Sequence, residues 1–128
     1  MTHTTAEWVK KAEGDYDDVC RTLRSRKSNR FDSICFHSQQ CVEKYLKARL
    51  NEAGIAFPKT HDLTQLVDLL RSIEPLWLGM DTEFAELTRF AVRVRYPGLY
   101  ANHAQAKESV ATCRRLRKLA RASLGLKA

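Results

Sequence analysis

Apolar residues recur at steps of three and four along most of the chain, which is the spacing of one buried helix face. A first helix is predicted from the Ser/Thr-x-x-Glu capping box of Thr4 and Glu7 to about Arg26. A second is predicted over about residues 31–53. Gly54 follows it and tolerates the left-handed conformation that commonly ends a helix. The pattern therefore predicts two long helices joined by a short basic loop.

Three more helices are predicted in the second half of the chain. Thr60 is a suitable N-cap for a third helix, which Pro75 would end. A fourth is predicted to begin at residue 81 or 82 and to end before Pro97, and a fifth to cover about residues 102–123. Strand-like alternation of useful length is absent from the sequence. Because short connections make neighbouring helices antiparallel, we expect an all-α, antiparallel up-and-down bundle of four to five helices.

Length and composition indicate the number of domains in this bundle and its expected location in the cell. The chain has 128 residues, which fits a single domain over 1–128 with a basic tail at about 121–128. Its apolar runs are shorter than the ~20 residues that span a bilayer, and its start lacks the pattern of a signal peptide. We therefore expect a cytoplasmic protein without membrane contact.

The net charge of +7 is unevenly placed, since residues 107–128 hold seven basic residues and one acid. A basic balance favours association with polyanions such as RNA, or with acidic proteins. A solvated helix face with a frayed cationic tail explains the same charge without a partner.

The four cysteines predict no metal site. Cys20, Cys35, Cys41 and Cys113 fall at apolar helical positions, without a Cys-x-x-Cys pair or a histidine at zinc-finger spacing. We interpret them as small buried hydrophobic residues in a reducing compartment, and we expect neither a metal nor a cofactor.

A line of polar residues in the second helix is the first candidate for chemistry. His37, Gln40, Lys44 and Lys47 are spaced three, four and three apart, so they share one side of the helix beside its apolar stripe. Partly buried groups of this kind need hydrogen-bond partners, because an unsatisfied one costs about 1–3 kcal/mol. The partners are other helices, a second subunit or a ligand. A polar network that only fixes the register of the helices is the simpler alternative.

Other polar residues fall at the predicted helix ends. Asp62 suits the start of the third helix, and arginines at the end of the fourth complement its free carbonyl groups. Tyr96 precedes Pro97, which moves it out of helical geometry and lets its hydroxyl reach a groove. The candidates at these ends are His61, Asp62, Arg93, Arg95, Tyr96 and His103.

Three blocks of the sequence together resemble the HEPN family (higher eukaryotes and prokaryotes nucleotide-binding). They occur in the family's order and span most of the chain. One departure is Cys41, where the family often has alanine. The blocks are Phe36-His37-x-x-Gln40-Cys41-x-Glu43-Lys44-x-x-Lys47-Ala48, Pro58-x-Thr60-His61-Asp62-Leu63-x-x-Leu66 and Arg95-Tyr96-Pro97.

The resemblance implies a compact helical bundle that forms a homodimer. Small members often accompany a minimal nucleotidyltransferase as the two halves of a toxin–antitoxin pair. Many members are metal-independent ribonucleases that use an arginine, four to six further residues and a histidine, with the site assembled across the dimer. In that chemistry the guanidinium holds the scissile phosphate and the imidazole moves the proton of the ribose 2′-hydroxyl.

The arginine–histidine spacing of this chain departs from that motif. Seven residues separate Arg95 from His103, and Pro97 and Gly98 interrupt the segment. Arg30 and His37 have six residues between them, but they lie at the start of the second helix rather than in the family's usual C-terminal position. Arg95 with His103 is therefore the first candidate catalytic pair, and Arg30 with His37 the second.

Three functional hypotheses follow from the sequence. The first is a HEPN module that binds nucleotide or RNA, a nucleotidyltransferase-like partner, or both. The second is a metal-independent endoribonuclease with its site at a homodimer interface, and the third is an interaction bundle without a ligand. The groove of the first hypothesis would be lined by His37, Gln40, Lys44, His61, Arg95 and Tyr96.

Overall fold

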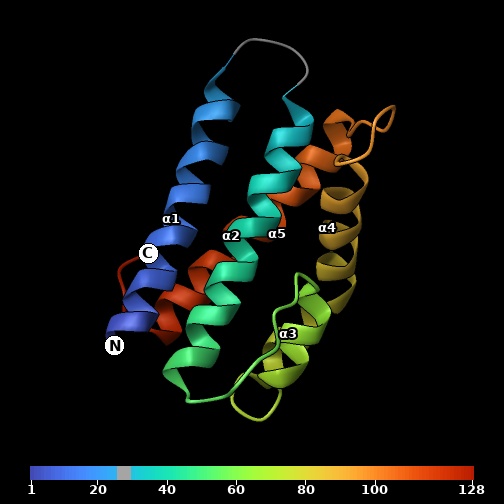
Figure 1. Cartoon of the computed structure of the whole chain (residues 1–128). Helices are drawn as coiled ribbons and strands as arrows, with labels where there is room; N and C mark the ends of the chain where they lie inside the picture. The colour runs from blue at the N-terminus through green and yellow to red at the C-terminus, as the bar shows by residue number, and fades with distance from the viewer. Residues whose placement is uncertain (26–29) are drawn as a thin grey trace.

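The computed structural model describes residues 1–25 and 30–128, and within them it contains helices and no strand. α1 and α2 lie side by side and antiparallel, α5 crosses behind them, and α3 and α4 lie along the other side of α2 (Figure 1). This arrangement confirms the predicted all-α bundle. The elements are α1 (His3–Arg24), α2 (Phe31–Glu52), α3 (Leu63–Leu69), the 3-10 helix η1 (Pro75–Met80), α4 (Asp81–Arg93) and α5 (His103–Ser123).

The start of α1 differs from the prediction. Its N-cap is Thr2, whose Oγ1 accepts a hydrogen bond from the backbone N of Thr5 at 3.1 Å. The amide of Asn51, in the last turn of α2, donates to Oγ1 of both threonines at 3.1 and 2.9 Å. The predicted cap at Thr4 is wrong because this tertiary contact favours the earlier threonine. Arg26, the predicted end of the helix, lies outside the described residues.

The third helix is shorter than predicted and has a different cap. Oδ1 of Asp62 accepts from the backbone N of Thr64 at 3.0 Å, which makes Asp62 the N-cap. Thr60, the predicted cap, instead accepts from the backbone N of Asp62 at 3.1 Å and shapes the turn before the helix. Pro75 stands at the start of η1, because its fixed φ suits the first turn of a new helix.

The fifth helix agrees with the prediction at both ends. Asn102 is the N-cap, and its side chain and that of Gln105 bond each other's backbone N–H groups at 2.8 and 3.0 Å. Beyond the helix, Leu124 and Leu126 pack against the core, and the side chain of Arg121 bonds the carbonyl of Lys127. The basic tail is therefore folded back rather than frayed.

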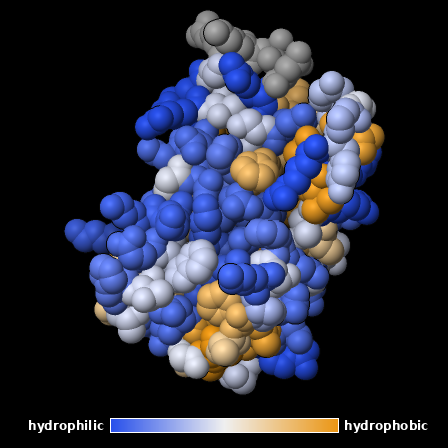
Figure 2. All heavy atoms as spheres, viewed as in Figure 1, coloured by the Kyte–Doolittle hydropathy of each residue, from blue (hydrophilic) through white to orange (hydrophobic). Residues whose placement is uncertain are grey.

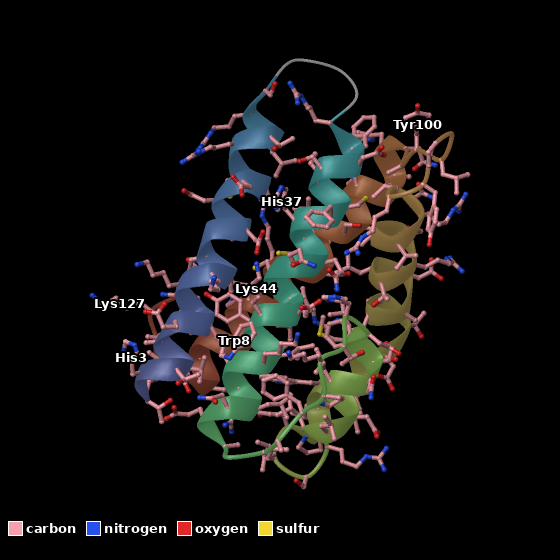
Figure 3. The ribbon with its side chains drawn as sticks, viewed as in Figure 1. His3, Trp8, His37, Lys44, Tyr100 and Lys127 are labelled. Atoms are coloured by element: carbon pink, nitrogen blue, oxygen red, sulfur yellow. The ribbon has the colours of Figure 1, made fainter. Side chains whose placement is uncertain are left out.

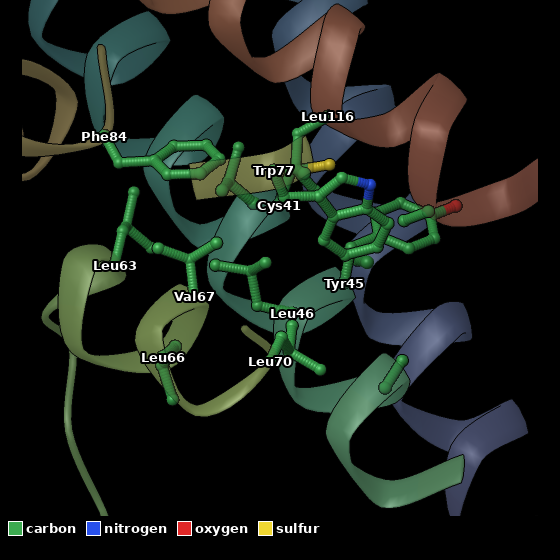
Figure 4. Packing of buried hydrophobic residues seen from close by; sticks show 14 of the residues in the cluster. Cys41, Tyr45, Leu46, Leu63, Leu66, Val67, Leu70, Trp77, Phe84 and Leu116 are labelled. Atoms are coloured by element: carbon green, nitrogen blue, oxygen red, sulfur yellow. The ribbon is translucent and has the colours of Figure 1, made fainter. Parts of the chain in front are cut away.

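The main core lies where α2 meets α3, α4 and α5. Leu46 of α2 is fully buried near Leu63 and Val67 of α3, and Leu116 of α5 covers the same region (Figure 4). A smaller apolar cluster packs the start of α2 against the C-terminal part of α1, the C-terminal part of α4 and the N-terminal part of α5. Its members are Val19, Ile34, Cys35, Phe90, Ala106 and Val110.

The cysteines are free thiols, and three of the four are fully buried, as the sequence predicts. Cys20 is the exception, since it is partly exposed on α1. In the described part of the chain, none of the helices is long and apolar enough to span a bilayer.

A partly buried polar contact joins α1 to α5. Arg117 donates from Nε and Nη2 to the two carboxylate oxygens of Glu13, both at 2.8 Å, and the hydroxyl of Tyr45 donates to the same carboxylate. Burial on its own would raise the pKa of Glu13, but the hydrogen bonds from Arg117 and Tyr45 outweigh it and the pKa is lowered. The contact therefore stabilises the packing of α1 on α5 while Glu13 is ionised.

Candidate functional site

The polar line of α2 meets a carboxylate of α1. Nδ1 of His37 lies 2.9 Å from Oδ1 of Asp15, and Nζ of Lys44 donates to its Oδ2 at 2.5 Å. The side chain of Asp15 is only 10% exposed, so this carboxylate is held between the two helices. Figure 3 shows His37 and Lys44 together between α1 and α2. Two of the predicted ligand-binding residues thus share one buried partner.

This contact fixes the state of the imidazole ring. A carboxylate oxygen can only accept a hydrogen bond, so Nδ1 of His37 carries the proton shared with Asp15. In a neutral imidazole the other nitrogen, Nε2, is then an acceptor. Orientation of a histidine by a carboxylate in this way is typical of groups that transfer protons.

A second polar network runs along α2 toward α3. Gln40 donates to Oε1 of Gln39 at 2.8 Å, and Gln39 donates to the backbone carbonyl of His61 at 2.9 Å and to Oε1 of Glu43 at 3.1 Å. Nδ1 of His61 lies 2.9 Å from the same Glu43 oxygen, with its ring largely exposed. Gln40 and His61 are therefore linked through Gln39 and Glu43, which were not among the predicted ligand-binding residues.

Lys47 is the one member of the polar line that faces the interior. Its side chain is 8% exposed and donates to Oε2 of Glu43 at 3.0 Å. The ammonium lies 5.5 Å from the ring centre of Trp8 and 6.0 Å from that of Phe57. Ion pairing and these cation–π contacts satisfy the buried charge, so Lys47 has a structural role.

Arg95 is linked to His37 through the ring of Phe36. The guanidinium carbon of Arg95 lies 5.3 Å from the centre of the Phe36 ring, and that ring meets the His37 ring edge-to-face at 5.2 Å. The next residue, Tyr96, is 60% exposed. The end of α4 therefore lies against the same stretch of α2 that carries the Asp15–His37 contact.

The loop after α4 is fixed to the first turn of α2. The backbone N of Ala101 donates to Oδ1 of Asp32 at 2.7 Å, and the ring of His103 packs edge-on against Phe31 at 5.6 Å. Tyr100 stands out from this loop and is 79% exposed. A hollow beside the loop is lined by Phe31, Asp32, Tyr100 and Ala101.

Neither predicted catalytic pair is in direct contact. Among the described residues, Arg95 contacts Phe36 and His103 contacts Phe31, so the two members of the first pair meet α2 at positions five residues apart. Arg30 is exposed just before α2, whereas His37 is turned toward α1 by Asp15. Assembly of either pair within one subunit would need a substrate that bridges the two residues.

Asp15 is another site residue that sequence reasoning missed. Its signal was present, since Asp15 lies three residues after Ala12 and four before Val19, both fully buried. A carboxylate inside an apolar stripe needs a cationic or hydrogen-bonding partner. Phe36 was part of the quoted pattern, but nothing in the sequence marks it as the platform for an arginine 59 positions later.

Figure 2 shows this face of the molecule as mainly hydrophilic over α1 and α2. Apolar groups gather at the end near α3 and beside the upper part of α4. The face of the molecule formed by α1 and α2 is therefore mainly polar.

A model of the HEPN domain matches residues 5–123, which is nearly the whole chain. The chain belongs to the HEPN family. HEPN domains commonly dimerise, and the family is often linked to RNA binding or nuclease activity. Comparison with curated proteins and with solved structures finds no match for this HEPN protein.

Proposed function

We propose that this HEPN protein binds RNA through a surface made by the end of α4, the following loop and the start of α2. We call it the α2–α4 surface. The observation that carries the proposal is the Arg95 guanidinium placed over Phe36, beside the carboxylate-held His37. We assign to this surface the half-buried Phe36 and the exposed residues Arg30, Arg93, Arg95, Tyr96 and Tyr100.

The chemistry of the α2–α4 surface suits a single-stranded nucleic acid. A guanidinium pairs with phosphate oxygens in a planar, bidentate manner. The exposed rings of Tyr96 and Tyr100 offer flat faces for bases, and base–aromatic stacking contributes about 1–3 kcal/mol per base. Because His37 and Lys44 use polar atoms on Asp15, we assign them to the ordered floor of the site, with direct RNA contact from Arg95 and the tyrosines.

Fluorescence anisotropy with a labelled, mixed-sequence, single-stranded RNA of about a dozen nucleotides tests this proposal, since such sites cover roughly 4–16 nucleotides. Tyr96→Ala and Tyr100→Ala should each weaken binding at least fivefold. Arg95→Ala should also lower the slope of log affinity against log salt by about 0.7, the loss of one phosphate contact. Competition with mononucleotides distinguishes an RNA site from a nucleotide site.

Arg71→Ala is the matched control. Arg71 is also exposed and pairs with Asp68 of α3. α3 lies toward the opposite end of the molecule from the loop after α4 (Figure 1). The variant removes one positive charge and leaves the α2–α4 surface intact. Equal weakening by Arg71→Ala and Arg95→Ala would show that net charge alone attracts RNA, and absence of binding at low salt would refute the proposal.

A second candidate function is metal-independent RNA cleavage, and the Asp15–His37 contact favours it. With its proton on Nδ1, His37 can accept the ribose 2′-hydroxyl proton at Nε2 while an arginine holds the phosphate. The resulting 2′-oxygen would attack the adjacent phosphorus and release the 5′-oxygen of the next nucleotide, which takes up a proton. His103, which forms the first candidate pair with Arg95, is the alternative base.

RNA incubated with the protein and a chelator tests the enzymatic hypothesis. If His37 is the base, His37→Ala should abolish cleavage and Asp15→Asn should slow it, whereas His103→Ala identifies the alternative. His3→Ala, at an exposed position in the first turn of α1, is the control. Absence of cleavage by the wild type, or cleavage unchanged in both the His37 and His103 variants, would eliminate this function.

Family membership also supports a homodimer and a nucleotidyltransferase-like partner, in a toxin–antitoxin pair. Light scattering during size-exclusion chromatography measures whether the protein is a dimer. Co-purification with the product of the neighbouring reading frame tests for the partner. A monomer at micromolar concentration that does not retain this product would contradict both.

A further inference from the structure

Three donor atoms from α1 and α2 converge beside the polar line. Oδ1 of Asp15 and Oδ2 of Asp18 lie 2.9 and 3.7 Å from Nδ1 of His37. Ligand atoms of the three residues all lie within 4.8 Å of one another. Two of the donors are carboxylate oxygens and the third is an imidazole nitrogen, so the set is mixed in chemistry.

A hydrogen bond accounts for only two of these three groups. Nδ1 carries at most one proton, and at 2.9 Å Asp15 accepts it. Asp18 faces the same nitrogen at 3.7 Å, which is too long for a hydrogen bond. Metal–nitrogen and metal–oxygen bonds of about 2.0–2.2 Å place neighbouring ligands roughly 3–3.5 Å apart. The two distances from Nδ1 bracket that range, and the ligand atoms of all three residues lie within 4.8 Å of one another, so one ion in place of the proton could contact all three groups after side-chain movement.

The surroundings hold the donors in place. The second oxygen of Asp15 accepts from Lys44, which orients the carboxylate as outer hydrogen bonds do in metal sites. The ring of Phe36 packs against His37. Asp18 has a 47% exposed side chain, which leaves an open side for entry of the ion and for water ligands. Two carboxylates and one ammonium leave the cluster one negative charge when the imidazole is neutral, and a divalent cation offsets it.

We propose that Asp15, Asp18 and His37 bind a divalent transition-metal ion, Zn²⁺ or Mn²⁺. A nitrogen ligand with two carboxylates suits these ions, whereas Mg²⁺ prefers oxygen alone and retains most of its water. The proposal departs from the sequence-based expectation of no metal, because that expectation considered cysteines and zinc-finger spacing and not a carboxylate on a neighbouring helix. The metal ligands do not include Arg95, Tyr96 or Tyr100, to which we assign direct RNA contact, so metal binding and RNA binding are tested by different substitutions.

Isothermal titration of the chelator-treated protein with ZnCl₂ or MnCl₂ tests the site. Asp18→Asn removes one ligand and leaves the Asp15 contacts in place, and Asp17→Asn is its neighbouring control, since Asp17 is exposed and pairs with Arg21. His37→Ala is compared with His3→Ala in the same way. The wild type and both controls should bind one equivalent, and the Asp18 and His37 variants should bind at least tenfold more weakly.

Thermal unfolding gives a second readout, because an ion that binds only the folded protein raises Tm. The rise with Mn²⁺ should be present in Asp17→Asn and absent in Asp18→Asn. Cysteine-bound metal would be unaffected by these substitutions, so equal affinity of Asp18→Asn and Asp17→Asn would overturn the proposal. Absence of binding to the wild type would also overturn it, as would equal affinity for Mg²⁺ and Mn²⁺.

Discussion

Glu13→Gln tests how the bundle is held together across α1 and α5. The substitution keeps the shape of the side chain and removes its charge, opposite an arginine that donates two hydrogen bonds of 2.8 Å. A hydrogen bond to a charged group contributes about 1.5–3 kcal/mol. Because the side chain of Glu13 is 33% exposed, solvent replaces part of this loss. We expect the free energy of unfolding to fall by about 1–2 kcal/mol, and Tm by roughly 3–8 °C for a chain of this size.

The pH dependence of this difference follows from the lowered pKa of Glu13. A carboxyl group whose pKa is lower in the folded state stabilises the fold above its unfolded pKa, near 4.5 for glutamate. That contribution is lost as the pH falls through the folded pKa, because the folded and unfolded chains then bind the same proton. The stability gap between wild type and Glu13→Gln should therefore be full at pH 7 and narrow progressively below pH 4.5.

Urea unfolding followed by circular dichroism at several pH values measures both effects. Glu86→Gln is the control, since Glu86 pairs with Arg89 on the surface of α4 and should contribute no more than about 0.5 kcal/mol. A gap that stays constant down to pH 3, or an equal loss in Glu86→Gln, would refute the assigned role of the Glu13–Arg117 contact.

Two further predictions concern the Phe36 ring beneath Arg95 and the Asn102 cap of α5. Phe36→Leu should keep the fold and weaken RNA binding about threefold, because Arg95 loses a cation–π contact of about 0.5–1 kcal/mol; unchanged anisotropy titrations would contradict this. Asn102→Ala removes the side-chain acceptor of the α5 capping box and should lower the free energy of unfolding by about 1 kcal/mol. Urea unfolding checks the second prediction, and a loss below about 0.3 kcal/mol would show that the cap contributes little.

The helices could be predicted because their signals are local. Apolar spacing places α2, and Asn102 with the following residues places the start of α5, without knowledge of the rest of the chain. The cap of α1 could not be predicted in the same way. Thr2 and Thr4 are both acceptable caps locally, and the choice depends on Asn51, nearly 50 positions away.

The candidate site could be predicted only in part for the same reason. Spacing put His37 and Lys44 on one side of α2, but their common partner depends on how α1 is aligned along α2. Arg95 was placed in the same site as α2 because both belong to sequence blocks that resemble the HEPN family. Its contact with Phe36 depends on the path of the chain after Arg93, which no local pattern fixes.

Ultraviolet crosslinking of the protein to single-stranded RNA, with the crosslinked residues identified by mass spectrometry, tests the central claim most directly. The account predicts crosslinks at Tyr96 and Tyr100, which are exposed in the segment that follows Arg95. Crosslinks confined to Trp8 and Phe57, which pack together near the start of α1, would contradict it.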